Sequence, residues 1–372
     1  RTADTIARFG GDEFAILIED ASDNDAAMTV VERVLELMRH PFHLEGKEVF
    51  ASASIGIAVA EPDHSASDLL RNADMAMYIA KQSGKGRYCR FEPRMHTEAL
   101  ERLELEGDLR HAIDRGEFTL RYQPIVALKT GAIAGVEALV RWNHPTRGML
   151  SPLTFIPLAE ETGLIVPLGR WVVREACRQA VGWQPLRHAA EPLTLTINIS
   201  GHQLQGEGVV EDVRSALSDS GLDPRQLVLE ITESVLMQQS DTILERLHAL
   251  KALGVRLAID DFGTGYSSLG YLQRFPIDIL KIDKSFVDDV GRGDGNSALA
   301  RAVIALGDTL RLETIAEGIE LKQQLSGLQD LGCELGQGYF FDRPIEPADI
   351  EFALRNAYAP LVGRVGVLAN SK

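Results

Sequence analysis

Acidic and amide side chains recur at the ends of successive aliphatic segments from residue 137 onward. Successive side chains of a β-strand point to opposite faces, and in these segments the polar residues share one face while aliphatic residues take the other. If helices cover the aliphatic faces, the polar groups converge on one mouth of the fold. The residues of this kind are Glu137, Asn198, Glu230, Asp260, Asp261, Asp283 and Glu317.

Six of these residues are carboxylates, which cannot share one site unless their pKa values rise or cations bind between them. Oxygen ligands favour hard ions such as Mg²⁺ and Mn²⁺. So many ligands suit two ions about 3.5–4 Å apart, the arrangement used for in-line displacement at phosphorus. Lys281 shares this face and is placed to hydrogen-bond the attacking water or the charge that develops at phosphorus. The pattern predicts a metal-assisted phosphoester hydrolase.

Each of these residues has a simpler interpretation when it is taken alone. A carboxylate at a strand end is commonly a helix N-cap or a solvated loop residue, and Asp283 precedes a helix that we expect to begin at Lys284. Asn198 alone is typical of a turn. The glycine-rich segment from Asp261 to Ser268 is either a flexible connection or a mobile loop that positions the two neighbouring acids. Recurrence on successive strands favours the shared site.

The elements that must position these side chains alternate between strand and helix patterns. Eight strands separated by helices fit an α/β fold, a (βα)8 TIM-like barrel, whose chemistry lies at the C-terminal strand ends. About seven residues around Lys129–Gly131 join the first two strands, too few for a helical crossover, which predicts one antiparallel strand. The expected strands are Phe118–Ile125, Ile133–Arg141, Leu193–Ile199, Leu227–Thr232, Val255–Asp260, Ile277–Ile282, Thr314–Ala316 and Gly338–Phe341.

The segment before the barrel follows a different pattern. Residues 1–92 alternate strands and helices, with a hairpin around Gly10-Gly11 and one longer strand over Val49–Ala60, as in a partial α+β domain. Residues 93–108 are charged and helical and are predicted to form a linker helix. The barrel is expected over residues 109–358, followed by a C-terminal tail, 359–372.

Composition limits the classes of function. The chain has 38 basic and 54 acidic residues, a formal net charge of −16, which disfavours a protein that coats duplex nucleic acid. No apolar run approaches the length of a membrane span, and three widely spaced cysteines suit a reduced, cytoplasmic setting. Because the sequence does not begin with Met, we expect it to be a piece of a longer protein.

Several motifs occur together and in order over residues 106–355, and there the sequence resembles the EAL-domain family of cyclic di-GMP phosphodiesterases. The resemblance implies a metal-dependent phosphodiesterase that hydrolyses cyclic di-GMP to linear pGpG through a water activated by two ions, Mg²⁺ or Mn²⁺. The motifs are Glu137-Ala-Leu-Val-Arg141, Asn198 in Thr-Ile-Asn-Ile-Ser, Glu230-Ile-Thr-Glu233, Asp260-Asp261-Phe-Gly-Thr-Gly-Tyr, Lys281-Ile-Asp283, Ala316-Glu317-Gly-Ile-Glu320 and Gln337-Gly-Tyr.

The resemblance also implies a role for each matching residue. Ligands of one ion would be Glu137, Asn198, Glu230 and Asp260, and ligands of the second would be Asp260, Asp261 and Glu317. Catalytic roles fall to Lys281, Glu317, Asp261 and Gln337, with Lys281 addressing the nucleophilic water. Substrate contacts fall to Arg141, Asp283, Gln337 and Glu320, and Glu233 would steady the glycine-rich loop.

Residues 1–92 resemble the C-terminal half of a GGDEF domain, the family that makes cyclic di-GMP from GTP, with its palm-like α+β fold. Gly10, Gly11, Asp12 and Glu13 form the naming motif on the predicted hairpin, and Arg1 and Asp4 match the family's product-binding inhibitory motif. The first half of that domain is absent from the sequence, so we do not expect this segment to synthesise the dinucleotide.

Three functions stay open at this point. The first is an active phosphodiesterase, the second is a cyclic di-GMP receptor without turnover, and the third is a net diguanylate cyclase in the full-length protein. The resemblance further implies a homodimer through the EAL domain. It allows upstream sensory domains or a membrane anchor, with this segment on the cytoplasmic side.

Overall fold

A computed structural model of the chain describes residues 4–19, 25–44, 46–82, 84–186, 192–237, 240–263, 272, 274–290 and 297–356. The chain forms two compact units, residues 1–105 and 106–372, and the division falls within the helix α3, Arg94–Ala112. This helix continues four residues past the predicted linker. No described helix combines the length and the apolar character needed to cross a membrane.

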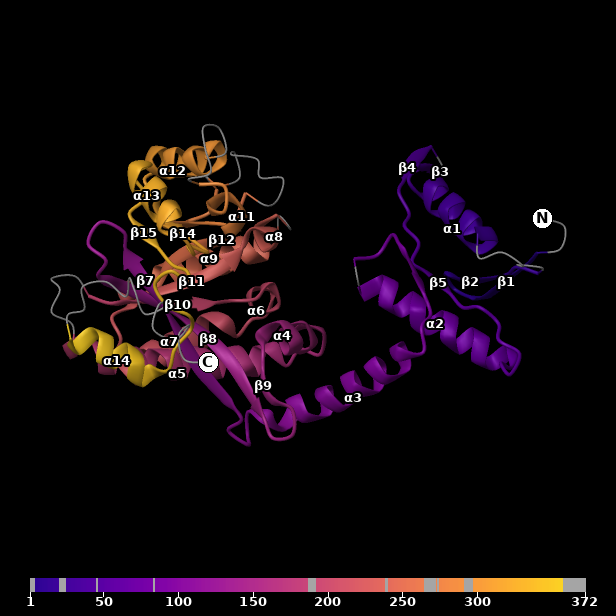
Figure 1. Ribbon diagram of the computed structural model, residues 1–372, viewed down its shortest axis with the longest axis horizontal. Helices are drawn as coiled ribbons and strands as arrows, with labels where there is room; N and C mark the ends of the chain where they lie inside the picture. Colours follow the sequence, from indigo (N-terminus) through magenta and orange to yellow (C-terminus); the bar gives the residue numbers. More distant parts are fainter. Residues whose placement is uncertain are drawn as a thin grey trace. The chain divides into compact units, whose positions relative to one another are not determined.

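The second unit is a closed barrel of eight strands (Figure 1). The strands β8 and β10 to β15 run parallel to one another, whereas β7 is antiparallel to both of its neighbours, β8 and β15. The predicted TIM-like barrel with one antiparallel strand is therefore confirmed. The barrel strands are β7 Phe118–Ala127, β8 Ile133–His144, β10 Thr194–Asn198, β11 Leu227–Thr232, β12 Arg256–Phe262, β13 Ile279–Ile282, β14 Glu313–Ala316 and β15 Leu335–Gly336.

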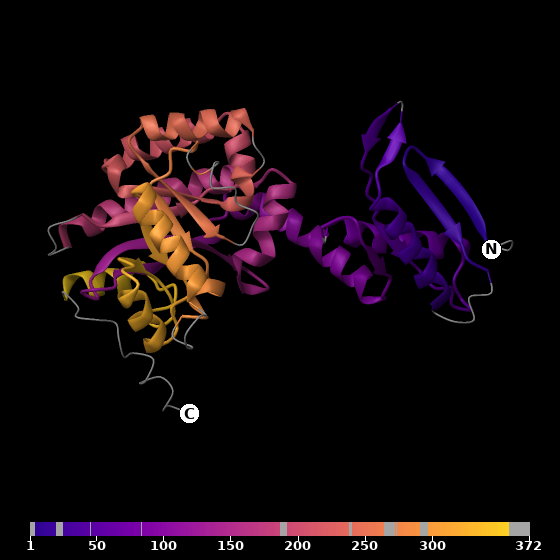
Figure 2. The ribbon, with the colours of Figure 1, turned by 90° about the horizontal axis from the view of Figure 1, so that it is seen from above.

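Helices surround the barrel and bury the aliphatic outer faces of its strands (Figures 1 and 2). Leu195 and Ile197 on β10 and Leu280 on β13 are fully buried, as the alternating pattern requires. A short strand, β9 Gly148–Leu150, pairs only with β8. The helices of this unit are α4 Pro152–Glu161, α5 Ile165–Trp183, α6 Gly201–Gln205, α7 Val209–Ser220, α8 Glu233–Leu236, α9 Asp241–Ala252, α11 Lys284–Val287, α12 Ala298–Leu310, α13 Lys322–Asp330 and α14 Pro347–Arg355, with 3₁₀ turns at Gln184–Leu186 and Pro224–Gln226.

An apolar floor closes the inside of the barrel. It consists of Ile125, Val228, Ala258, Ile279 and Ile315, with Leu335 packed against them. Each member comes from a different strand and points inward, so the barrel interior is packed rather than hollow at this level. The floor separates whatever lies above it from water at the other end of the barrel.

The eighth strand does not lie where the sequence analysis placed it. It was predicted over Gly338–Phe341, but β15 is Leu335–Gly336. The backbone of Gly338 lies so close to Ile319 that a Cβ there would be 2.2 Å from the Ile319 nitrogen. The Ile319 N–H donates to the Gln337 carbonyl oxygen, so the chain leaves the barrel after Gln337 and follows the loop beyond β14.

The first unit is a small α/β arrangement of paired strands and two helices before α3. The single strand predicted over Val49–Ala60 is wrong, since Val49 ends the strand Lys47–Val49 and a separate strand, Ile55–Ile57, pairs in parallel with Tyr88–Arg90. Gly56 there lets α2 approach, because a Cβ would be 1.9 Å from the Ala73 carbonyl oxygen. The elements are β1 Thr5–Gly10, β2 Glu13–Leu17, α1 Asp25–Met38, β3 Phe42–Leu44, β4 Lys47–Val49, β5 Ile55–Ile57, α2 Ala66–Gln82 and β6 Tyr88–Arg90.

Candidate active site

A layer of polar side chains lies directly above the apolar floor. On each of five strands the polar residue comes two positions after a floor residue, so it points inward and one step nearer the C-terminal strand end; Glu230 follows Val228 in this way. Glu137 joins them, because it pairs in register with Gln123, two residues from Ile125 on the antiparallel β7. We call this set the polar layer: Glu137, Glu230, Asp260, Lys281, Glu317 and Gln337.

Lys281 lies at the centre of the polar layer. Its ammonium nitrogen is 2.6 Å from Glu317 Oε1, 2.8 Å from Glu230 Oε1 and 3.0 Å from Asp260 Oδ1. Glu137 Oε2 is further away, at 3.7 Å. Lys281 and Glu230 are both 1% exposed, so these ion pairs lie in a medium that screens charge far less than water does.

Two amide side chains hold Glu137 from either side. Asn198 Nδ2 donates to Glu137 Oε1 at 2.7 Å. Gln337 Nε2 lies 2.8 Å from Glu137 Oε2 and 2.8 Å from Glu317 Oε1, and so it links β15 to β8 and to the end of β14. With its amide nitrogen turned to Glu137, Asn198 keeps its carbonyl oxygen available as a ligand or acceptor.

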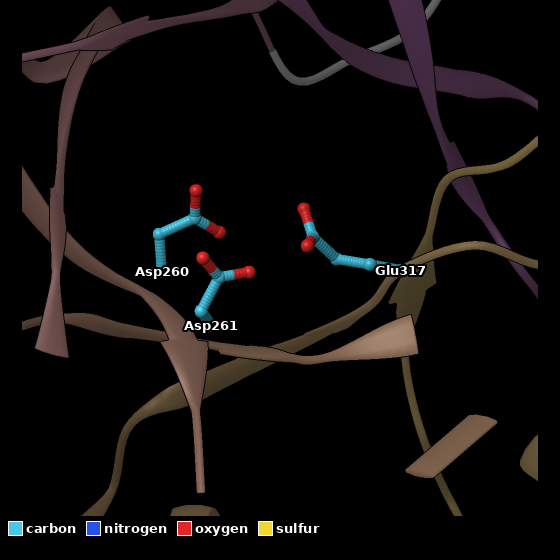
Figure 3. Close-up of side chains that lie close together, drawn as sticks. All are labelled: Asp260, Asp261 and Glu317. Carbon is cyan, nitrogen blue, oxygen red and sulfur yellow. The ribbon is translucent and has the colours of Figure 1, made fainter. Parts of the chain in front are cut away.

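Asp260, Asp261 and Glu317 bring their carboxylates together at the mouth of the barrel (Figure 3). Oxygens of the three lie within 4.8 Å of one another. Consecutive strand residues ordinarily face opposite sides, but the β12–β13 register shifts between Ile259 and Phe262, and Asp261 has a φ of 54°. This irregularity lets both aspartates face the same mouth.

Burial controls the protonation of the layer. It raises the pKa of Glu230 well above its usual value and that of Glu317 to about 8. The charge of Lys281 opposes both shifts, and the neighbouring carboxylates add to them. Burial also raises the pKa of Asp261, with the charges of Asp260 and Asp283 adding to it. Burial would lower the pKa of Lys281, yet the surrounding carboxylates outweigh it and raise that pKa. The site strongly favours added positive charge.

The polar layer has the donor set that hard divalent cations require. Glu230 Oε2 and Gln337 Oε1 are buried, and neither has a hydrogen-bond partner in the part of the chain that the structure describes. Buried oxygens without partners are costly unless an ion or water completes them. Carboxylate and amide oxygens suit Mg²⁺ or Mn²⁺. The residues present therefore fit divalent ions.

The remaining predicted site residues lie around this layer. Arg141, on the same face of β8 as Glu137, is half-buried, and burial lowers its pKa. Asp283 is the N-cap of α11 and accepts from the Ser285 N–H at 3.0 Å, so the simpler interpretation of this residue also holds. Glu320 pairs with Lys284 at 3.0 Å, and is exposed.

Glu233 and the glycine-rich segment meet at the end of β12. Glu233, on the helix α8 after β11, is buried and accepts from the Gly263 N–H at 2.8 Å. A substitution at Gly263 would be strained because its φ is 98°. Residues 264–270, the rest of the predicted loop to Ser268, lie outside the described residues.

One feature at the rim of the mouth, the contact between Arg343 and Tyr339, was not predicted from the sequence. The guanidinium of Arg343 lies 4.7 Å from the ring centre of Tyr339, whose exposed fraction is 46%. Tyr339 is also one of the groups that act on the pKa of Arg141, so it lies on that side of the mouth. The signal was available, because Tyr339 belongs to the Gln337-Gly-Tyr motif and Arg343 follows four residues later.

The predicted nucleotide residues of the first unit lie on its hairpin. Gly11 and Asp12 form the turn between β1 and β2, and Glu13 begins β2. Gly11 has a φ of 51°, and its carbonyl oxygen accepts from Arg8. Gly10 is the last residue of β1, and Asp4 lies directly before that strand. Arg1 lies outside the described residues.

The fold and the polar layer define an α/β barrel protein with a cluster of acidic side chains that fits divalent cations at the C-terminal mouth, the place where barrel enzymes carry their chemistry. The sequence model of the EAL domain matches residues 106–344. The chain belongs to the EAL domain family. The model described as diguanylate cyclase, GGDEF domain, matches residues 1–87, which confirms the tandem arrangement inferred from the motifs.

Relatives share both segments. MucR of Pseudomonas aeruginosa, named a bifunctional diguanylate cyclase/cyclic di-GMP phosphodiesterase, is 46% identical over 94% of this chain and 50% of its own length. PdeR of Escherichia coli, named a cyclic di-GMP phosphodiesterase, is 38% identical over 93% of this chain and 52% of its own. The chain spans about half the length of these curated relatives.

Solved structures agree with the barrel. The structure of the MucR phosphodiesterase in complex with c-di-GMP is 44% identical, covers 66% of this chain and 99% of that one, and has a TM-score of 0.63. The EAL domain of Mycobacterium smegmatis DcpA is 36% identical, covers 66% of this chain and 99% of that one, and has a TM-score of 0.56.

Proposed function

We propose that the chain hydrolyses cyclic di-GMP to linear pGpG with two divalent cations, Mg²⁺ or Mn²⁺. The observation that carries this proposal is the polar layer, in which two buried and two partly buried carboxylates surround Lys281. Buried oxygens of the layer also lack hydrogen-bond partners among the described residues. Membership of the EAL domain family and the names of the relatives support the choice of substrate.

The family resemblance implies two sets of ligands, and the closeness of the acidic side chains supports them. One ion would be held by Glu137, Asn198, Glu230 and Asp260, and the other by Asp260, Asp261 and Glu317. Bound ions would lower the pKa of a shared water and offset charge on the phosphate oxygens. Asp261 and Glu317 have raised pKa values, so loading the site would drive protons off these acids.

The other site residues would orient the reactants. Lys281 would donate a hydrogen bond to the attacking water once a bound ion takes over one of the three carboxylates that its N–H groups now face. Arg141 would bind a phosphate of the substrate from the wall of β8. Gln337 would hold Glu137 and Glu317 in place, and Glu233 would hold the loop at Gly263. Asp283 and Glu320 would contact the substrate at the rim.

Chromatography of substrate and product tests this proposal. Purified protein, incubated with cyclic di-GMP and Mg²⁺ or Mn²⁺, should convert it to pGpG, and EDTA should stop the conversion. Binding of the dinucleotide without any product would refute the hydrolase and favour the receptor. GTP turnover by the full-length protein, exceeding hydrolysis, would favour the net cyclase.

The assembly and location of the protein are also proposals. We propose a homodimer through the EAL domain, on the cytoplasmic side, with regulation from outside this segment. Light scattering on the purified protein measures its oligomeric state. A monomer at the concentrations of the activity assay would refute the proposed homodimer.

A further inference from the structure

One cation serves all the acids buried above the floor. Among the residues that the structure describes, Lys281 is the only lysine or arginine that forms an ion pair with any of Glu137, Glu230, Asp260 and Glu317. Glu137 and Glu230 are 5% and 1% exposed. Water cannot screen these charges as it screens those on the surface, so the ammonium is their main source of compensation.

The position of Lys281 keeps its charge inside the barrel. Ile279, two residues earlier on the same face of β13, belongs to the apolar floor, and the Lys281 side chain is 1% exposed. The ammonium therefore cannot turn towards water without leaving its partners. Lys284, three residues later, is different: it pairs with Asp288 and Glu320 at the rim, and its side chain is 45% exposed.

Lys281 and a divalent ion would draw on the same oxygens. Asp260 and Glu317 contribute both to the ion pairs of Lys281 and to the cluster with Asp261 at the mouth. An ammonium beside these ligands repels an incoming cation and already satisfies part of their charge. Removing it would leave two buried and two partly buried carboxylates without a cation, which is strongly destabilising until another cation arrives.

We propose that Lys281 is the resident counter-ion of the polar layer, which allows the barrel to fold without divalent ions and lowers the affinity of the site for them. This inference rests on the proposed function only in that divalent ions bind the layer. It differs from a contact with the attacking water, because such a contact would change turnover alone. A counter-ion also changes folding and ion binding in the absence of substrate.

The substitution Lys281→Met tests the proposal, because it keeps an unbranched side chain and removes the charge. Thermal unfolding is followed in EDTA and in Mg²⁺ or Mn²⁺, and ion binding is measured by calorimetry without substrate at an alkaline pH, where the acids are ionised. Lys284→Met is the matched control at the rim. The double variant Lys281→Met/Glu230→Gln removes one negative charge together with the positive one.

In EDTA, Lys281→Met should unfold about 10 °C or more below the wild type, whereas Lys284→Met should unfold near it. The double variant should recover part of that loss. Divalent ions should stabilise Lys281→Met more than the wild type, with a dissociation constant at least about tenfold lower.

Two results would overturn the proposal. One is a Lys281→Met protein as stable in EDTA as Lys284→Met and with wild-type ion affinity. The other is a protein that stays unfolded at saturating ion and is not improved by Glu230→Gln, which would show that the side chain is needed for packing. The comparison in EDTA needs no ion, so it decides the counter-ion role even if the wild type binds no ion. Failure of the wild type to bind divalent ions would instead refute the metal part of the proposed function.

Discussion

Gln337→Leu should lower turnover while leaving the barrel folded. Gln337 is 6% exposed, and its amide nitrogen lies 2.8 Å from Glu137 Oε2 and 2.8 Å from Glu317 Oε1. Leucine is one atom shorter and can pack in the same space, but it donates no hydrogen bond. Glu137 and Glu317 would then be free to turn away from the positions in which they would serve as cation ligands.

The size of the effect follows from the hydrogen bonds that are lost. A hydrogen bond to a charged group contributes about 1.5–3 kcal/mol. Losing one such contribution in the transition state corresponds to a decrease in kcat of about 10- to 150-fold. Losing both would exceed that range only if neither carboxylate found another donor. Gln337→Glu should be worse, since it adds a carboxylate against two others.

The assay is steady-state hydrolysis of cyclic di-GMP at saturating Mn²⁺ or Mg²⁺, with thermal unfolding as the check on the fold. Gln329→Leu is the matched control, because Gln329 donates to the Leu128 carbonyl oxygen at 2.6 Å from the helix α13, outside the barrel. We expect that control to keep its turnover. A Gln337→Leu enzyme within about threefold of the wild-type kcat would refute the positioning role that we derive from the two hydrogen bonds.

Three further outcomes are expected. Glu137→Ala should abolish hydrolysis and weaken ion binding in calorimetry, and near-wild-type values for both would contradict its role as a ligand. In EDTA, the contribution of Glu317 to the free energy of unfolding should be complete below about pH 4.5, its usual pKa, and should be lost as the pH rises through its folded pKa of about 8. Ion affinity should rise over the same interval. Chemical unfolding at several pH values measures the change in stability. Glu233→Ala should lower kcat, because the Gly263 N–H loses its acceptor and the loop its anchor, whereas Glu233→Gln, which keeps an acceptor, should recover most of it; equal kcat values for the two variants would count against the hydrogen bond.

Alternation along the strands predicts much of the site because barrel strands are regular where they are buried. Glu230 and Glu317 each follow an inward aliphatic residue, Val228 and Ile315, and the structure places both carboxylates above the floor. The alternation of strand faces could not orient Asp261, because its position depends on a register shift between β12 and β13 and on a positive φ. A regular two-residue repeat predicts neither feature. The place of Asp261 directly after Asp260 at the strand end, not the alternation, pointed to this residue.

The misplaced eighth strand has a similar cause. Gly338–Phe341 has the composition of a strand, but the backbone contact between Gly338 and Ile319 depends on where another loop lies. Local patterns carry no information about such a contact. The ion pairs of Lys281 are likewise set by tertiary structure, since their four partners come from β8, β11, β12 and the end of β14.

The floor gives the polar layer its chemical character. With Val228, Ala258 and Ile279 packed beneath it, the layer is open to water only from the mouth, so charges in it interact strongly. The same barrel with aliphatic residues at these positions would be expected to be at least as stable, because buried ionic groups seldom improve on apolar packing. Raised carboxyl pKa values and partnerless oxygens are therefore a cost in the metal-free protein, and cations bound at the mouth would remove it. The free energy gained when bound cations remove this cost is the source of the ion affinity that a hydrolytic site at this mouth requires.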